Sequence, residues 1–167
     1  FSPDAECHIT GYRALDWDKS VLMGTVAGQP FECEIGTVGR HQALNAAAAM
    51  LVADTLGVPI DDAAKGLANA VLPPMRMEKR LIGGVLFLLD NYNASPDSTV
   101  AALRTLREVS VRGRRAAVLG EMRELGAFSQ SGHRLIGKAV AETLPDLVLL
   151  YGEATGQTLD EAVGLGC

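Results

Sequence analysis

The chain has 167 residues, of which 48% are hydrophobic and 5% aromatic, and its formal net charge is -5. This size and composition suit one ordinary domain or two small ones with a real core, and they exclude a disordered, collagen-like or coiled-coil chain. The acidic balance argues against nucleic acid or an anionic membrane surface as a partner, and no apolar run approaches the roughly 20 residues of a membrane span.

Charge is divided unevenly along the chain. Residues 1–75 carry 4 basic and 9 acidic side chains, whereas residues 76–167 carry 11 of each. Such a shift in composition indicates a domain boundary near residue 75. Three cysteines without a CxxC pair predict neither a disulfide framework nor a zinc site, and favour reduced thiols in the cytoplasm. No segment has the order of a signal peptide. Because the first residue is Phe1 rather than Met and residues 164–167 carry no terminal signature, we interpret the sequence as a piece of a longer protein.

The first part of the chain predicts short strands followed by two helices. Residues 21–26 and 31–35 alternate in polarity around a Gly/Pro turn, which predicts a β-hairpin. Helices are expected over 40–56 and over about 61–70, and the prolines of segment 72–75 should end the second one and form a linker. The expected buried stripe of the first helix is Leu44, Ala47, Ala48, Leu51, Val52 and Leu56.

Further along, strands and helices alternate. Continuous apolar runs predict three strands that are covered on both faces, at 85–89, 116–119 and 147–151. Helices are expected after the capping residue Ser95, over 129–144 and over 154–163. This β-α-β-α-β-α order is typical of an α/β fold and predicts parallel strands joined by right-handed crossovers.

Polar loops follow all three predicted strands, beginning at Asp90, Gly120 and Tyr151. The carboxyl ends of parallel strands are where α/β sheets bind ligands, so these loops are candidates for a site. The alternative is that residues such as Asp90 and Asn93 only form the turns that commonly follow strands.

Two more polar features stand outside these loops. Residues 39–45 open the first helix, where free backbone donors favour anions, and His41 and Asn45 share one face because they are four residues apart. The alternative for them is a polar capping turn. Arg76 directly follows the proline linker, where it suits a phosphate in a cleft between domains, although a linker arginine is more often solvated.

Several motifs are missing from the sequence. It has no GxxxxGK[ST], GxSxG or HExxH, and no His/Cys cluster with metal-ligand spacing. Five arginines near the second predicted strand have acidic neighbours and no aromatic ones, which favours a solvated face: Arg104, Arg107, Arg112, Arg114 and Arg115.

Four segments resemble, in the same order, motifs of the Mur ligase family. The family's Gly-x-His-Asn-x-x-Asn-Ala is similar to residues 39–46, its Pro-Gly-Arg to residues 74–76, and its Asp-Ser-Tyr-Asn-Ala-Asn-Pro to residues 90–96. Its Val-Leu-Gly-Asp-Met-x-Glu-Leu-Gly, followed by a Ser and a His, is similar to residues 118–126 with Ser129 and His133. Tyr92-Asn93-Ala94 resembles most the member that adds D-Ala-D-Ala to UDP-MurNAc-tripeptide.

The resemblance implies the tail of a central Mur-type ATPase domain over 1–73, followed by a truncated Rossmann-like β-α-β ligase domain over 74–167. It implies a cytoplasmic, ATP-dependent ligase of peptidoglycan synthesis that forms an amide through an acyl phosphate. ATP and Mg²⁺ would be required, with the magnesium ligands and the phosphate-binding loop mostly upstream of Phe1. We therefore expect a monomer at full length, and no ligation by this piece alone.

The resemblance also implies site residues. His41 and Asn45 would line the ATP site, and Arg76 and Asp90 would reach phosphate or ribose. The substrate side would be shaped by Tyr92, Asn93, Ser95 and Glu124. No residue is assigned as catalytic or as a metal ligand.

Four positions depart from the family's pattern, namely Gln42 for Asn, Met75 for Gly, Ser95 for Asn and Glu121 for Asp. Gln42 lengthens an amide side chain, and Met75 removes the conformational freedom of a glycine. They leave two alternatives open, a non-catalytic nucleotide-binding module of the same fold and a sibling Mur or folylpolyglutamate ligase. The siblings usually have a His near position 92–94.

Overall fold

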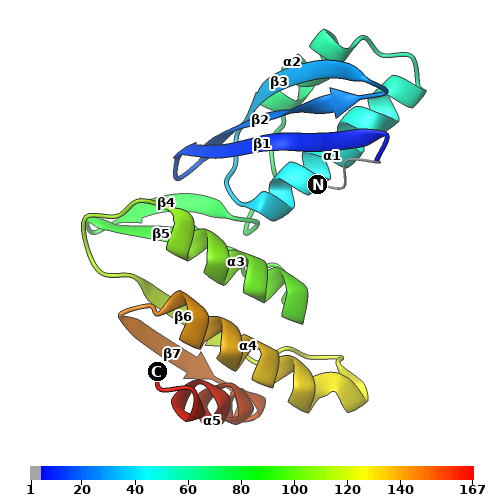
Figure 1. The fold of residues 1–167 in the computed structure, drawn as a ribbon. Helices are drawn as coiled ribbons and strands as arrows, with labels where there is room; N and C mark the ends of the chain where they lie inside the picture. The colour runs from blue at the N-terminus through cyan, green and yellow to red at the C-terminus, as the bar shows by residue number, and fades with distance from the viewer. Residues whose placement is uncertain (1–4) are drawn as a thin grey trace. The chain divides into compact units, whose positions relative to one another are not determined.

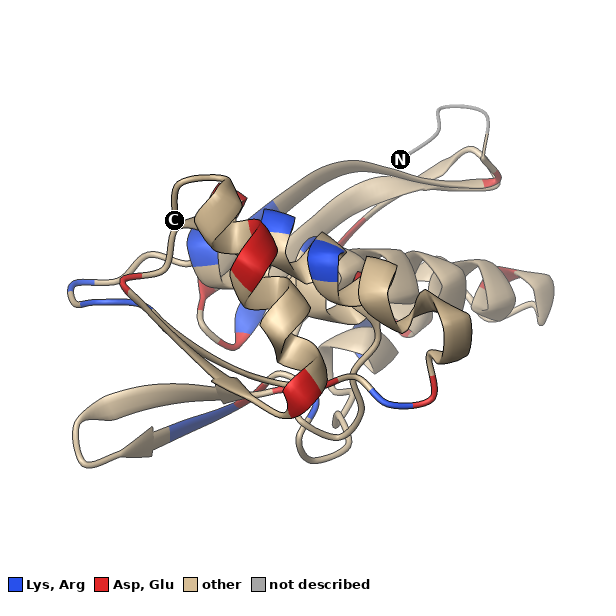
Figure 2. Cartoon of the chain, turned by 90° about the horizontal axis from the view of Figure 1, so that it is seen from below, with Lys and Arg blue, Asp and Glu red and all other residues tan. Residues whose placement is uncertain are grey.

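The computed structural model describes residues 5–167 (Figure 1). The chain divides into two compact units, Phe1–Asp90 and Asn91–Cys167, and each has its own hydrophobic core. The domain boundary expected after residue 73 stays a prediction. None of the helices within 5–167 is long and apolar enough to cross a membrane. Basic and acidic residues are interspersed along the chain rather than gathered on one element (Figure 2).

The first unit contains a three-stranded antiparallel sheet backed by two helices. The sheet consists of β1 (Cys7–Asp16), β2 (Lys19–Val26) and β3 (Gln29–Ile35) in that order, which confirms the predicted hairpin. Alternate residues of β2 and β3 are buried because one face packs against α1 (Arg40–Thr55) and α2 (Ile60–Ala68). The core of this unit consists of Ile9, Leu22, Val26, Phe31, Cys33 and Ile35 with Ala43, Ala46, Ala47 and Met50 of α1.

Helix α1 has its predicted length but buries a different face. Its buried residues are Ala43, Ala46, Ala47 and Met50, whereas Leu44 is 47% exposed and Val52 is 58% exposed. The predicted stripe is therefore wrong by about one residue of rotation. The buried face is mostly alanine, and alanine lets the helix backbone lie close to the sheet, so closeness of packing decides the face rather than side-chain size.

A second hairpin completes the first unit. Its strands are β4 (Glu78–Ile82), which the sequence analysis missed, and β5 (Val85–Leu89). Gly83 and Gly84 form the tight turn between them with φ of 57° and 80°, values that favour glycine. The expectation of a parallel strand covered on both faces at 85–89 is wrong within this unit. β5 pairs antiparallel with β4, and Val85 is 56% exposed because a two-stranded hairpin offers no second layer.

The second unit alternates helices with two parallel strands. Its elements are α3 (Pro96–Glu108), β6 (Ala116–Gly120), the short 3-10 turn η1 (Gly126–Phe128), α4 (Ser129–Thr143), β7 (Leu147–Tyr151), the 3-10 turn η2 (Glu153–Thr155) and α5 (Gly156–Gly164). β6 and β7 pair in parallel, as predicted. Residues of all three helices pack on one face of the pair, and the core consists of Leu103, Ala117, Met122, Ile136, Ala139, Val140 and Ala162.

The other face of this parallel pair is exposed. Val118 is 73% exposed, Leu149 is 51% exposed and Tyr151 is 80% exposed. The prediction that β6 and β7 are covered on both faces is wrong for the described residues, because their three helices pack on the same face.

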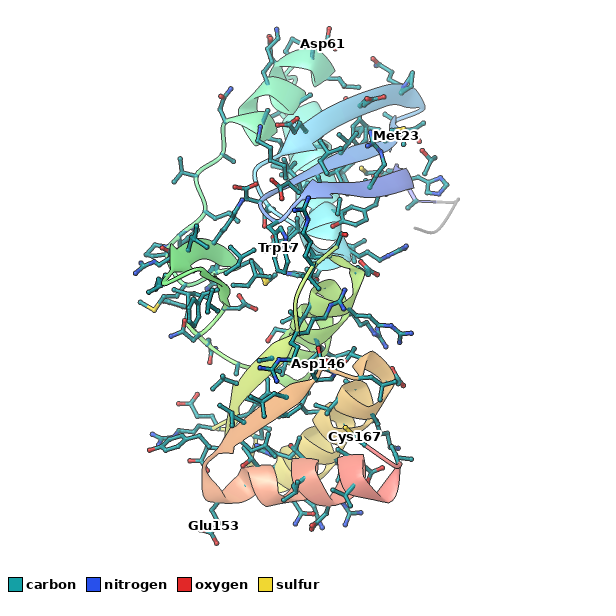
Figure 3. All side chains as sticks on the ribbon, turned by 90° about the vertical axis from the view of Figure 1, so that its left-hand side faces the viewer. Trp17, Met23, Asp61, Asp146, Glu153 and Cys167 are labelled. Carbon is teal, nitrogen blue, oxygen red and sulfur yellow. The ribbon has the colours of Figure 1, made fainter. Side chains whose placement is uncertain are left out.

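Arg115 closes the end of α3. Its side chain donates from Nε to the carbonyl of Leu106 and from Nη2 to the carbonyl of Val109, both at 3.0 Å. Its backbone N–H donates to Oδ2 of Asp146 at 2.7 Å, just before β7 (Figure 3). Arg107 donates to the carbonyl of Glu142. Two of the five arginines expected on a solvated face therefore satisfy backbone carbonyls, which helix ends leave unpaired.

Candidate functional site

The loop between β3 and α1 is held at two points. The Oγ of the fully buried Ser20 donates to the carbonyl of Thr37 at 2.7 Å, and the N–H of Gly39 donates to the hydroxyl oxygen of Tyr12 at 2.6 Å. Gly39 is the residue before α1 and has φ of 108°, which favours glycine over residues with a Cβ. The start of α1 is therefore fixed in place by the sheet.

His41 lies in the first turn of α1 and is half-buried. Its Nδ1 is buried and has no hydrogen-bond partner. Burial lowers the pKa of the imidazole, while the negative charge of Asp90 acts in the opposite direction. A buried nitrogen without a partner is costly unless a ligand satisfies it, and a neutral imidazole offers both a donor and an acceptor.

A pocket of about 140 Å³ lies beside the same loop. It is lined by Ile35, Gly36, Thr37, Gln42, Asn45, Ala46, Leu67, Ala70 and Leu72. Thr37 Oγ1 is buried without a partner, and Asn45 Nδ2 donates to Oε1 of Gln42 at 3.2 Å. Apolar walls with amide and hydroxyl groups suit a flat ligand that has a polar edge.

The first turn of α1 contains no acidic side chain that would neutralise its N-terminal backbone donors. The positive end of a helix dipole attracts anions, so this end of α1 is compatible with a phosphate group. The residues present thus fit a nucleotide. Sequence analysis had selected His41 and Asn45 but missed Thr37, because its significance lies in the burial of its hydroxyl rather than in any motif.

A second pocket, of about 320 Å³, contains Arg76. Its lining is Asp18, Gly36, Leu72, Pro73, Pro74, Arg76, Met77, Glu78 and Lys79. Lys79 lies 3.1 Å from Oδ2 of Asp18. Arg76 itself is exposed and lines this pocket.

Asp90 was expected to reach phosphate or ribose. In the structure it is half-buried, and its Oδ1 accepts the backbone N–H of Met77 at 3.1 Å. Asp90 and Arg76 therefore belong to the same unit and are connected through Met77.

The candidate residues of the second unit are mostly exposed. Tyr92 is 63% exposed, and the Oδ1 of Asn93 accepts the N–H of Ala94 at 2.9 Å. The Oγ of Ser95 accepts the N–H of Ser98, and the Oγ of Ser98 accepts the N–H of Ser95 in return, so Ser95 caps α3. The Ser95 hydroxyl is thus engaged by its own helix.

Glu124 lies in the loop after β6 and is exposed, with a left-handed φ of 63°. The side chain of His133, which is 1% exposed, holds this loop in place. The N–H of Met122 donates to His133 Nε2 at 3.1 Å, and His133 Nδ1 lies 2.8 Å from the carbonyl oxygen of Ser129. The buried His133 ring thus joins the loop after β6 to the start of α4.

Glu121 connects the loops after the two parallel strands. Its N–H donates to the carbonyl of Tyr151 at 2.9 Å, and its carboxylate lies 3.5 Å from the N–H of Ala154. A Cβ on Gly152 would lie within 2.8 Å of the Glu121 carboxyl group. Glu121 therefore packs against the start of η2, which confirms that the loops after β6 and β7 meet, as expected for parallel strands.

Comparison with known families gives one clear match. Residues 75–166 match the family described as "Mur ligase, glutamate ligase domain". Among curated relatives, the UDP-N-acetylmuramoyl-tripeptide–D-alanyl-D-alanine ligase of Bacillus subtilis (strain 168) is 34% identical over 120 residues. That alignment covers 71% of this chain and 26% of the relative. The chain thus spans about a quarter of the length of this relative.

Solved structures give the same result. "Crystal structure I of MurF from Acinetobacter baumannii" has a TM-score of 0.89 and 28% sequence identity, covering 98% of this chain and 35% of that one. The MurF ligase of Thermotoga maritima, solved in complex with ADP, has a TM-score of 0.72 and 21% identity, covering 98% of this chain and 46% of that one. The second similarity concerns the fold alone.

Proposed function

The chain belongs to the Mur ligase family, and we propose that it contributes part of the ATP site and the dipeptide side of a ligase that joins D-Ala-D-Ala to UDP-MurNAc-tripeptide. The observation that carries this proposal is the 34% identity to a ligase of that name. The fixed start of α1, with two buried polar atoms that lack partners, supports the nucleotide role independently of that similarity.

The proposed ligation proceeds in two steps. A carboxylate oxygen of the tripeptide attacks the γ-phosphorus of ATP, which gives an acyl phosphate and releases ADP. The amine of D-Ala-D-Ala then attacks the acyl carbon, loses a proton and displaces phosphate, so that an amide bond remains. Charge develops on phosphate oxygens in both steps, and fixed donors that point at those oxygens lower the barrier.

In this proposal each unit has its own role. His41, Asn45 and the neighbouring pocket hold the nucleoside, while the start of α1 and Arg76 face phosphate oxygens. Tyr92, Asn93 and Glu124 face the dipeptide, whose ammonium group suits the exposed carboxylate of Glu124. Ser95 acts on that side by fixing the start of α3, since its hydroxyl caps the helix.

The remaining expectations stay proposals for the whole ligase. They are a monomer in the cytoplasm, an ATP-domain tail over 1–73 and a ligase domain over 74–167. The proposal of a ligase domain is supported by the family match that begins at residue 75. Mg²⁺ is a proposed cofactor as well. Residues 5–167 contain no group of three or more His, Cys, Asp or Glu that could hold a metal ion.

Titration of the isotope-labelled chain with ADP, followed by NMR, tests the nucleotide role. We expect amide shifts at His41, Asn45 and Arg76, and a loss of affinity of about tenfold in Asn45→Ala because an amide contact is removed. Gln29→Ala, at the exposed first residue of β3, is the matched control and should bind like the wild type. Unchanged spectra at millimolar ADP would contradict the proposal.

A second experiment concerns catalysis. The chain incubated with ATP, D-Ala-D-Ala and UDP-MurNAc-tripeptide should form no pentapeptide product, because its sequence contains no GxxxxGK[ST] to hold the ATP phosphates. The full-length Bacillus subtilis ligase serves as the positive control. Product formed by the chain alone would show that this assignment of parts is wrong.

A further inference from the structure

Arg76 stands between two residues with an uncommon backbone. Met75 has φ of 59° and Met77 has φ of 54°. A left-handed backbone is unfavourable for a residue with a Cβ, and such residues persist where neighbouring groups hold them. Two of them on either side of one arginine indicate that the position of Arg76 is imposed by its surroundings.

Two carboxylates hold this segment. Glu78 Oε2 accepts the backbone N–H of Met75 at 2.9 Å, and Asp90 Oδ1 accepts the backbone N–H of Met77 at 3.1 Å. Hydrogen bonds from backbone N–H groups to carboxylates are among the stronger ones in proteins. The backbone N–H of each methionine that flanks Arg76 thus donates to a different carboxylate, Met75 to Glu78 and Met77 to Asp90.

The hairpin β4–β5 supplies both carboxylates from the same end. Glu78 is the first residue of β4 and pairs with Leu89, the last residue of β5, and Asp90 follows directly. Glu78 is itself fixed, since its Oε1 accepts from Nε of Arg80 at 2.7 Å. The hydrogen bonds from Arg80 and from the backbone of Met75 lower the pKa of Glu78, which keeps it charged.

We propose that Glu78 and Asp90 are positioning residues for Arg76, holding the backbone on both sides so that the guanidinium faces a phosphate group of the nucleotide. This inference rests on the proposed function for the identity of the ligand. It also gives Asp90 a different role from direct contact with phosphate, because two anions repel each other, whereas a carboxylate that binds a backbone N–H can act through the neighbouring arginine.

The negative charge of Asp90 also acts on His41 in the same unit. An asparagine at position 90 would keep an oxygen acceptor for the N–H of Met77 but would remove the charge. An alanine would remove both. The pair of variants therefore separates the hydrogen bond from the charge.

The experiment compares Asp90→Asn and Asp90→Ala in the 167-residue chain by NMR, with Glu32→Ala on the exposed side of β3 as control. Two signals report geometry without any ligand: hydrogen exchange of the Met77 amide and the Nε–H resonance of Arg76. Asp90→Ala should raise exchange at Met77 by about tenfold or more and shift the Arg76 signal toward that of a mobile side chain. Asp90→Asn should keep both near wild type.

Addition of ADP then separates this inference from the proposed function. We expect Asp90→Ala to weaken ADP binding by about fivefold and Asp90→Asn by less than about twofold. Equal losses in both variants, or unchanged Met77 exchange in Asp90→Ala, overturn the positioning role. If ADP leaves the wild-type Arg76 signal unchanged, the proposed function fails, and the two ligand-free signals still decide whether Asp90 positions Arg76. Unchanged resonances of β1–β3 in each variant show that the unit remains folded.

Discussion

The sheets of the two units differ in how far their apolar residues are covered. In the antiparallel sheet of the first unit, buried and more exposed residues alternate along β2 and β3, and the outward side of β3 has the carboxylates Glu32 and Glu34. In the parallel pair of the second unit, the outward positions are apolar, and Val118, Leu149 and Tyr151 are exposed. An antiparallel sheet with one polar face needs one covering layer, whereas parallel strands made of apolar runs normally have two.

This difference determines what a sequence pattern can reveal. Alternation in residues 21–35 predicted the hairpin correctly, and its polar residues Thr25, Glu32 and Glu34 lie on the less buried side. The continuous run 147–151 contains no polar residue that marks an outward side, so it predicted a strand covered on both faces, whereas one face is exposed. Variants can test whether the two sheets really differ in this way.

The largest expected effect is in the core of the first sheet. Leu22→Ala removes a fully buried side chain and should lower the free energy of unfolding by about 2–5 kcal/mol. The matched variant Leu149→Ala, on the exposed face of β7, should change it by less than about 0.5 kcal/mol. Urea unfolding followed by circular dichroism measures both. A loss of several kcal/mol in Leu149→Ala would mean that this face is covered after all.

A buried polar contact gives the next largest effect, and it lies in the second unit. His133→Ala removes the acceptor of the Met122 N–H and leaves that donor unpaired in the core. Such a loss costs about 1–3 kcal/mol, apart from the cavity it creates. Gln130→Ala, on the exposed side of α4, is the control. Near-wild-type stability of His133→Ala, measured by urea unfolding, would show that the loop does not depend on this ring.

Left-handed residues offer a smaller, stabilising test in both units. Met75→Gly in the first unit and Glu124→Gly in the second should each raise the free energy of unfolding by about 0.5–1 kcal/mol, because glycine accepts a positive φ without strain. Val71→Gly, in an exposed segment with an ordinary backbone, should instead destabilise slightly. Thermal unfolding resolves these changes, and a destabilised Met75→Gly would argue against strain at that position.

The pH dependence of the first unit should be the mildest effect. Burial lowers the pKa of His41 below its ordinary value of 6.5, so the unfolded chain binds this proton more readily than the folded chain. The contribution of His41 to the free energy of unfolding is fully present above pH about 6.5. It falls as the pH drops from there through the lowered pKa. His41→Gln should flatten this part of the stability curve in urea titrations at several pH values. An unchanged slope would assign the pH dependence to other groups.

The sequence predicted most elements and part of the candidate site. Ser95 and Pro96 marked the start of α3, and the capping contact is present because those residue types supply it locally. The glycine pair Gly83-Gly84 carried a hairpin signal that was overlooked, so β4 was missed. The buried face of α1 could not be read, because alanines alone give no periodic contrast.

In the candidate site too, local features were predictable from the sequence and features that depend on tertiary contacts were not. The place of His41 at the start of α1 came from local signals and is confirmed by the helix boundary. The bond between Asp90 and Met77 joins residues on two sides of a hairpin, and the missing partner of Thr37 depends on burial by the whole unit. Neither is a property of residue types at a spacing, so no sequence pattern could give them.

Arg115 has a practical consequence for protease digestion. Its side chain and its amide are tied to the end of α3 and to Asp146, whereas Arg112 and Arg114 lie in an exposed segment outside any helix or strand. Trypsin needs a flexible stretch around the bond that it cuts. Brief digestion should therefore nick the chain after Arg112 or Arg114 and spare the bond after Arg115, which leaves the start of β6 intact in the carboxyl-terminal fragment.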